Sequence, residues 1–172
     1  MKKIIVGLFL LISANLYANL VDDGISEAQK GNNKKAVELF TKACEDKQAL
    51  GCYYAGQAYS KGDVVKKDFN EAFNYFTKSC NLGLVDGCMA LGKNYYYGAG
   101  TTKNYEKARK IFINGCAEGY SEGCFITGLI YELGQGAVQN KSTAKEYYKK
   151  ACDLGEGNGC RYYQELDRIG VE

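Results

Sequence analysis

The sequence predicts an all-α solenoid built from four disulfide-stapled helical hairpins. The first observation is a fixed cysteine spacing, in which gaps of 8 and 28 residues alternate along the chain. The second is that alanine, glycine and aromatic residues recur at the same 36-residue period. A period of this length is typical of proteins that stack one small unit several times. The cysteines lie at Cys44, Cys52, Cys80, Cys88, Cys116, Cys124, Cys152 and Cys160.

The N-terminus has the pattern of a secretory signal peptide, which we expect to span residues 1–18. Lys2 and Lys3 precede an apolar run of nine residues, and small residues follow it. We expect cleavage after Ala18, with Ala14 as the second choice. An uncleaved membrane anchor is the alternative, but a membrane-spanning helix needs about 20 apolar residues.

Export and an even number of cysteines together predict a secreted or periplasmic protein with disulfide bonds. Removal of Lys2 and Lys3 leaves 20 basic and 20 acidic side chains of the original 22 and 20. A chain without net charge is a poor partner for nucleic acid or an anionic membrane, so we expect neither of these, and no stable membrane insertion.

The mature chain divides into a capping helix over residues 19–34 and four repeats over residues 35–172. Within the capping segment, residues 21–31 resemble part of the second helix of a repeat, followed by a shortened loop. Solenoids need such end segments to shield their open cores. The repeats lie at about 35–66, 67–102, 103–138 and 139–172.

Each repeat is expected to form two helices, as the second repeat illustrates. Residues 70–80 carry apolar side chains at the i, i+3, i+4, i+7 spacing of an amphipathic helix. A second helix is expected over residues 86–97, with Gly98 ending it in the left-handed region. Gly92 lies inside this helix and recurs in two other repeats, which predicts close approach of a neighbouring helix. No segment shows the sustained alternation of a β-strand.

The cysteine pairing follows from geometry, although eight cysteines allow 105 connectivities. Pairing residues 28 apart leaves Cys44 and Cys160 unpaired, so pairing residues 8 apart is favoured. In one continuous helix such residues are about 12 Å apart, whereas a disulfide needs Cα atoms within roughly 7 Å. The chain must therefore reverse between them. The expected bridges are Cys44–Cys52, Cys80–Cys88, Cys116–Cys124 and Cys152–Cys160. With the cysteines committed and no histidine in the chain, we expect no metal and no cofactor.

These repeats resemble the Sel1-like repeat, and the cysteine pair in every unit resembles the Helicobacter cysteine-rich protein family. The resemblance rests on the matching sets Ala36, Ala72, Ala108, Ala144; Gly56, Gly92, Gly128; and Tyr59, Tyr95, Tyr131. It implies a tetratricopeptide-like right-handed superhelix with a concave groove. It also implies host-facing or envelope interactions, β-lactam binding and weak β-lactam hydrolysis.

The implied hydrolase activity has one weak candidate pair, Ser142 and Lys145, in the S-x-x-K spacing of serine β-lactamases. This spacing also arises by chance in a chain of this composition. Ser142 fits equally well as the N-cap of a helix. The accompanying S-D-N and K-T-G sequences are absent. If the chain is an enzyme, the resemblance implies a β-lactamase-type hydrolase.

The leading prediction is a monomeric scaffold that binds a peptide or a cell-wall-like ligand in its groove, with β-lactams as the other ligand class. The chain has 15 tyrosines, several of them adjacent in sequence, and tyrosine is frequent at binding interfaces. We expect some of these tyrosine rings to fill gaps between helices and the others to be exposed. For the groove we choose Asn74, Tyr75, Asn94 and Tyr95.

Overall fold

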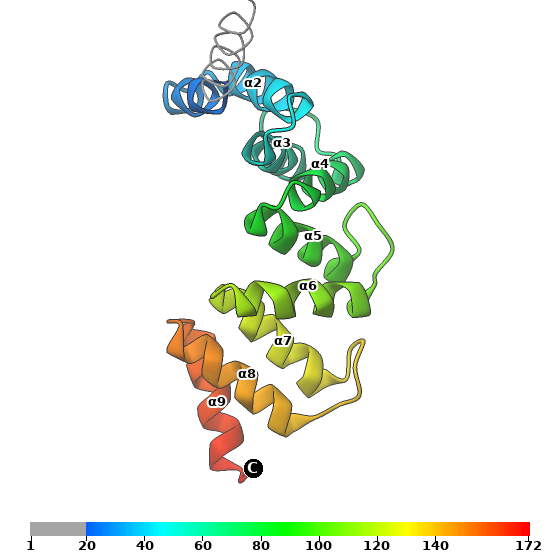
Figure 1. Cartoon of the computed structure of the whole chain (residues 1–172), viewed down its shortest axis with the longest axis vertical. Coiled ribbons are helices and arrows are strands. Elements are labelled where there is room, and N and C mark those ends of the chain that lie inside the picture. Colours follow the sequence, from blue (N-terminus) through cyan, green and yellow to red (C-terminus); the bar gives the residue numbers. More distant parts are fainter. Residues whose placement is uncertain (1–19) are drawn as a thin grey trace, which may run out of the picture. The chain divides into compact units, whose positions relative to one another are not determined.

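Helices separated by short links make up the part of the chain that the structure, a computed structural model, describes, which is residues 20–172. The first helical segment covers residues 20–29. Within this range there is no β-strand, and the all-α prediction is confirmed. The following helices are α2 (Asn33–Glu45), α3 (Ala49–Lys61), α4 (Phe69–Asn81), α5 (Val85–Tyr97), α6 (Tyr105–Ala117), α7 (Ser121–Leu133), α8 (Lys141–Asp153) and α9 (Gly157–Arg168) (Figure 1). The proposed signal peptide lies outside the described residues.

The chain divides into two compact units, one ending at Gly87 and the other running from Cys88 to Glu172. In the first unit α2 packs against α3, and α3 against α4. In the second unit α6 packs against α7, α7 against α8, and α8 against α9. We call α2, α4, α6 and α8 the A helices, and α3, α5, α7 and α9 the B helices. The expected ranges 70–80 and 86–97 agree with α4 and α5 to within one residue at each end.

An Asn or Asp residue directly precedes each A helix at the N-cap position, and its side chain caps the helix in three cases. Asp68 accepts hydrogen bonds from two backbone N–H groups of α4, Asn104 accepts one in α6, and Asn140 accepts one from Thr143 in α8. These side chains satisfy backbone donors that have no partner within the helix. Asn140, and not Ser142, is therefore the N-cap of α8, which corrects the sequence-based interpretation. Ser142 is an exposed residue of the first turn.

A disulfide joins the last turn of an A helix to the first turn of the following B helix. The Cα atoms are 4.4 Å apart in Cys44–Cys52, 4.6 Å in Cys116–Cys124 and 4.4 Å in Cys152–Cys160. Cys80 and Cys88 are also disulfide-bonded, and the described chain contains no free cysteine. The chain reverses at Gly83 and Gly119, whose φ angles are 89° and 86°, values that glycine adopts without strain. The disulfide-stapled hairpins are confirmed as the building unit.

The core is organised by contacts between a B-helix glycine and an aromatic ring of the next A helix. A Cβ atom on Gly56 would lie 2.7 Å from the Phe76 ring, and one on Gly128 would lie 2.6 Å from the Tyr148 ring. Gly92 faces Phe112 in the same way, at 3.0 Å. The rings are 5% exposed or less. This confirms the close helix approach expected from Gly92.

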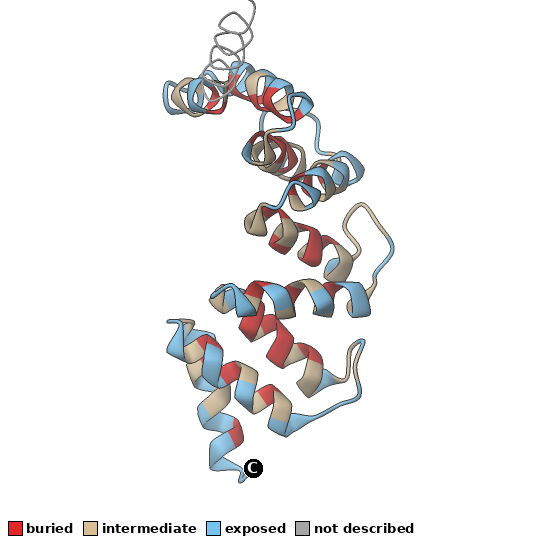
Figure 2. Cartoon of the chain, viewed as in Figure 1, coloured by how far each residue is buried: buried red, intermediate tan, exposed pale blue. Residues whose placement is uncertain are grey.

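The segment at residues 20–29 packs in the manner of a B helix. A Cβ atom on Gly24 would lie 2.5 Å from the Phe40 ring, and Val21 belongs to the same buried cluster as Phe40. Figure 2 shows the resulting buried residues on this segment and on α2. The segment thus covers α2 as the other B helices cover their A helices.

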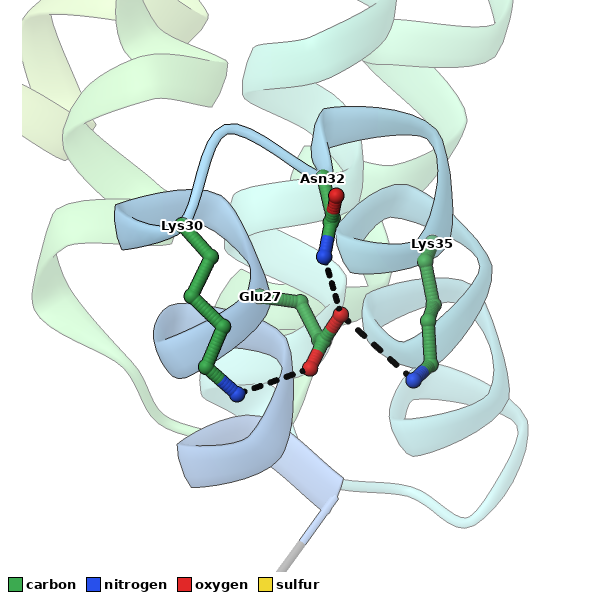
Figure 3. Close-up of polar contacts among 4 residues, drawn as sticks. All are labelled: Glu27, Lys30, Asn32 and Lys35. Atoms are coloured by element: carbon green, nitrogen blue, oxygen red, sulfur yellow. Dashed lines mark hydrogen bonds and ion pairs between the residues drawn. The ribbon is translucent and has the colours of Figure 1, made fainter.

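A polar cluster connects this segment to α2 (Figure 3). The Glu27 carboxylate accepts hydrogen bonds from Asn32 at 2.9 Å and Lys30 at 3.1 Å, and Lys35 lies 3.4 Å away. The hydrogen bond from Asn32, the one from Lys30 and the two positive charges lower the pKa of Glu27 from 4.5 to about 2. The carboxylate is therefore ionised across the physiological range.

The C-terminal end is closed by a comparable interaction. The Lys145 ammonium group lies 2.8 Å from the Asp167 carboxylate and also donates to the Val171 carbonyl oxygen. Val171 in turn packs against the cluster that contains Tyr148 and Leu166. Lys145 therefore ties α8 to the residues that follow α9.

Candidate functional site

The first unit carries a stacked pair of tyrosine rings between α3 and α4. The centroids of Tyr59 and Tyr75 are 5.5 Å apart, and their planes differ by 15°. The Lys78 ammonium group lies 5.2 Å from the centroid of the Tyr75 ring, within the range of a cation–π interaction. Tyr75 is only partly buried. The pair is thus a rigid aromatic surface that a ligand can reach.

A cleft of about 430 Å³ lies beside this pair. Its walls come mainly from α2, and both acidic and basic side chains contribute to them. They include Lys34, Val37, Glu38, Thr41, Glu45 and Tyr59. Thr41 and Tyr59 also interact with Tyr75, so the cleft and the tyrosine pair form one continuous surface. We call this surface the A face of the first unit.

The same tyrosine pair occurs in the second unit, 72 residues further along the chain. Tyr131 and Tyr147 have centroids 5.8 Å apart and planes that differ by 10°. Lys150 lies 5.1 Å from the Tyr147 ring. The Arg109 guanidinium group donates to the Tyr131 hydroxyl at 3.3 Å and to the Gly136 carbonyl oxygen at 3.1 Å. Both units therefore present two stacked rings with a lysine over the A-helix ring. We call the Tyr131–Tyr147 pair with Lys150 the A face of the second unit.

Burial favours the protonated form of Tyr75 and of Tyr147. Burial raises the pKa of Tyr75 above its ordinary value of 10.0, and a hydrogen bond with Thr41 offsets part of this effect. Burial also raises the pKa of Tyr147, with further contributions from Tyr131 and Glu146. A protonated phenol can both donate and accept a hydrogen bond. The rings of Tyr75 and Tyr147 therefore combine a flat apolar surface with a neutral hydroxyl group.

The residues chosen from the sequence for a groove have different positions in the structure. Tyr75 belongs to the A face of the first unit, and Asn74 is exposed on α4. Tyr95 occupies the position in the second repeat that Tyr59 and Tyr131 occupy in theirs, with Lys107 located 5.1 Å from its ring. Asn94 is only 7% exposed and its side-chain nitrogen has no hydrogen-bond partner. This corrects its assignment to a ligand-binding surface, because it lies at a core position of α5.

Sequence inspection missed Tyr59, Tyr131 and Tyr147 as members of these pairs. The signal was present in the chain, because the 16-residue separation of Tyr59 and Tyr75 is repeated by Tyr131 and Tyr147. Residue type alone did not show that the two rings of each pair stack. That contact depends on how a B helix packs against the next A helix.

The arrangement around Ser142 does not resemble an activated nucleophile. Its proposed partner Lys145 donates to Val171 and pairs with Asp167, and its side chain is 19% exposed. A nucleophilic serine needs a nearby base that can take its proton. The ammonium group of Lys145 is instead committed to the C-terminal contacts.

Residues 20–172 contain neither a metal-binding cluster nor a membrane-spanning helix. No group of three histidine, cysteine, aspartate or glutamate side chains in this range could hold a metal ion. None of the helices described here is long and apolar enough to cross a membrane.

The Sel1 repeat is the family whose sequence model matches the chain. It matches four consecutive segments, residues 12–47, 49–84, 85–120 and 121–156. Each of the last three contains a B helix followed by an A helix. The repeat boundaries of the family model are therefore shifted by about half a repeat from the boundaries inferred from the sequence. No curated protein sequence matches this chain.

Several solved structures are similar to the chain. A protective antigen of uropathogenic Escherichia coli matches 81% of it at 29% identity with a TM-score of 0.77. A Sel1 repeat protein of Oxalobacter formigenes matches 90% of it at 24% identity with a TM-score of 0.80. The chain spans only 30% of the first of these proteins and 64% of the second.

Cysteine-rich protein B of Helicobacter pylori shares 31% identity, with a TM-score of 0.57, over 74% of this chain and 92% of its own length. This similarity and the disulfide-bonded cysteines indicate an extracellular or periplasmic protein. The chain therefore belongs to the Sel1 repeat proteins, in the cysteine-rich family represented by that Helicobacter protein.

Proposed function

We propose that the chain is an exported scaffold that binds an extended peptide on its A faces. The observation that carries this proposal is the repeated tyrosine pair, Tyr59–Tyr75 and Tyr131–Tyr147, each with a lysine over one ring. The folding core does not require such a pair in every repeat, since the third repeat has Ile111 at the position that corresponds to Tyr75, where it would be the partner of Tyr95.

The physical properties of these rings suit peptide recognition. A tyrosine offers a large contact area at a small cost in side-chain entropy, and its hydroxyl can bond to a peptide backbone. Stacking holds the rings before the ligand arrives, which lowers the ordering cost of binding. In the first unit, Glu38 and Lys34 in the adjacent cleft supply groups for charged side chains of the peptide.

Export before binding is the second part of this proposal. We propose that the chain is cut after Ala18 and that its cysteines are oxidised in the destination compartment. The mature chain then starts at Asn19, just before the helical segment at residues 20–29. Intact mass spectrometry of the native protein tests this proposal, since the mature mass must correspond to a start at Asn19 with every thiol oxidised.

The binding proposal is tested with an array of synthetic peptides probed by the oxidised chain. Selected peptides are then titrated against the variants Tyr75→Phe and Lys78→Ala. The first variant keeps the aromatic ring and removes only its hydroxyl group. The second removes an exposed side chain of α4 and leaves the core unchanged. We expect affinity to fall about tenfold for a residue in the centre of the site. Leu133→Ala is the control, because Leu133 is 56% exposed and belongs neither to a tyrosine pair nor to a cleft.

Equal losses in Leu133→Ala and the A-face variants would contradict the proposal, as would the absence of any bound peptide. Binding of soluble peptidoglycan fragments in place of peptides would identify a cell-wall ligand. Hydrolysis of the β-lactam nitrocefin that disappears in Ser142→Ala would instead support the enzymatic alternative.

A further inference from the structure

A second cleft lies in the second unit, on the B helices. Its volume is about 410 Å³, within the usual range of ligand-binding pockets. Residues from the end of α5, from one side of α7 and from the N-cap and start of α9 form its walls. The principal ones are Tyr96, Tyr97, Glu122, Phe125, Leu129 and Glu156. None of them belongs to the tyrosine pair Tyr131–Tyr147.

Aromatic rings form a firm apolar surface in this cleft. The Phe125 ring packs against Tyr148 and Tyr162, with centroid distances of 5.7 Å and 5.5 Å. Tyr96 and Tyr97 contact each other edge to face, with centroids 5.0 Å apart. Phe125 is half-buried and Tyr97 is exposed. Each of these two rings is therefore held by neighbours while part of it remains accessible.

The apolar residue at position 129 is not required by the repeat. The corresponding residues of the other B helices are Gln57, Lys93 and Glu165, all of them polar. Leu129 is half-buried and lines the cleft. A polar side chain thus satisfies the fold at this point in three repeats, whereas α7 has an apolar side chain there, in the wall of the cleft.

The rim of the cleft is acidic. Glu122 lies in the first turn of α7, and Glu156 is the N-cap of α9. No lysine or arginine contributes to the walls of this cleft. Lys93 pairs with Glu122 at 2.8 Å, but both side chains are nearly half exposed, so water screens the pair and a ligand can compete for the carboxylate. An approaching cation is attracted to this rim, whereas an anion is repelled.

We propose that this cleft docks a protein segment that carries an aromatic or aliphatic side chain next to a lysine or arginine. The apolar side chain occupies the space between Tyr97, Phe125 and Leu129, and the basic group lies against Glu122 and Glu156. This surface is separate from the peptide-binding A faces. The chain is therefore an adaptor that can hold one partner on an A face and a second, basic partner on the B helices.

The test uses two fluorescein-labelled peptides and the oxidised full chain. The first peptide has the sequence Gly-Ser-Lys-Phe-Lys-Leu-Ser-Gly, and the second has glutamate in place of both lysines. Fluorescence anisotropy should show binding of the basic peptide that weakens with added salt. Leu129→Lys places in α7 the residue that α5 already has, and we expect it to reduce affinity about tenfold or more. Gln57→Lys introduces a lysine at the corresponding position of α3, outside the cleft, and should leave binding unchanged.

Two further variants separate this proposal from the previous one. Glu122→Gln should weaken binding of the basic peptide and reduce its salt dependence, whereas Tyr75→Phe should have no effect. Equal binding of the acidic peptide, or equal effects of Leu129→Lys and Gln57→Lys, would overturn the proposal. Self-association that is lost in Leu129→Lys would show that a second copy of the chain occupies the cleft, which also overturns it.

Discussion

Replacing Gly128 by alanine tests the helix contact on which the repeat depends. Gly128 is buried in α7, and the ring of Tyr148 lies directly over it. A Cβ atom at this position would be 2.6 Å from two ring carbons and 3.2 Å from a third. Carbon atoms pack best at about 3.5–4.0 Å. The alanine methyl therefore requires α7 and α8 to separate by about 1 Å, or the ring to leave its place.

Two opposing effects set the expected change in the free energy of unfolding. Alanine is favoured over glycine inside a helix by about 1 kcal/mol. Overpacking a close-packed core costs about 1–3 kcal/mol, and the upper part of that range applies because Tyr148 is fully buried. The net expectation is a loss of about 2 kcal/mol. For a chain of this length the midpoint of thermal unfolding should then fall by about 4–8 °C.

Gly157→Ala is the matched control for this experiment. Gly157 is the first residue of α9, and a Cβ atom there would meet nothing within 4 Å. Circular dichroism melting curves of the two oxidised variants should therefore differ, with Gly157→Ala at least as stable as the unchanged chain. If Gly128→Ala is as stable as Gly157→Ala, the glycine–aromatic contact does not limit helix approach and the reasoning is wrong.

Three further predictions concern single interactions. The Tyr148 hydroxyl donates to the Glu132 carboxylate, so Glu132→Leu should lower the free energy of unfolding in urea by about 1–3 kcal/mol, and adding Tyr148→Phe should recover part of this loss; additive losses would contradict the pairing. Burial, and then the hydrogen bond to Glu132, raise the pKa of Tyr148 far above 10.0. The contribution of this group to the free energy of unfolding is therefore complete below pH 10 and falls above pH 10 by about 1.4 kcal/mol per pH unit. In urea titrations Tyr148→Phe should show a smaller dependence of stability on pH. Replacing Cys44 and Cys52 together by alanine should cost about 2–3 kcal/mol in the same assay, and no loss would show that this short loop adds nothing.

The architecture could be predicted because each repeat contains the same local information. Cysteines eight residues apart can pair only if the chain reverses between them, and that inference needs no knowledge of distant contacts. The contact of Gly92 with Phe112 could be anticipated for a similar reason, since the glycine recurs where a large residue would otherwise be expected. Local spacing was therefore enough for the hairpins and for their packing.

The sequence was less informative where a side chain's role depends on a distant segment. Asn94 is polar, yet its counterparts Ala58, Ile130 and Leu166 are apolar, and comparison of these positions would have placed it in the core. Lys145 was assigned to Ser142 by proximity in the sequence. The residues that bind it lie more than twenty positions later, and no local spacing points to them.

The short separation of the disulfide partners has a consequence for how the protein acquires its bonds. Cys44–Cys52, Cys116–Cys124 and Cys152–Cys160 each join cysteines eight residues apart. Segments of about ten residues close in roughly 10–100 ns, and closure becomes less probable as the loop lengthens. Each cysteine therefore meets its native partner before it meets the next cysteine, 28 residues away. Oxidation can proceed one hairpin at a time once the chain reaches an oxidising compartment, and we expect little need for an isomerase to correct mispaired bonds.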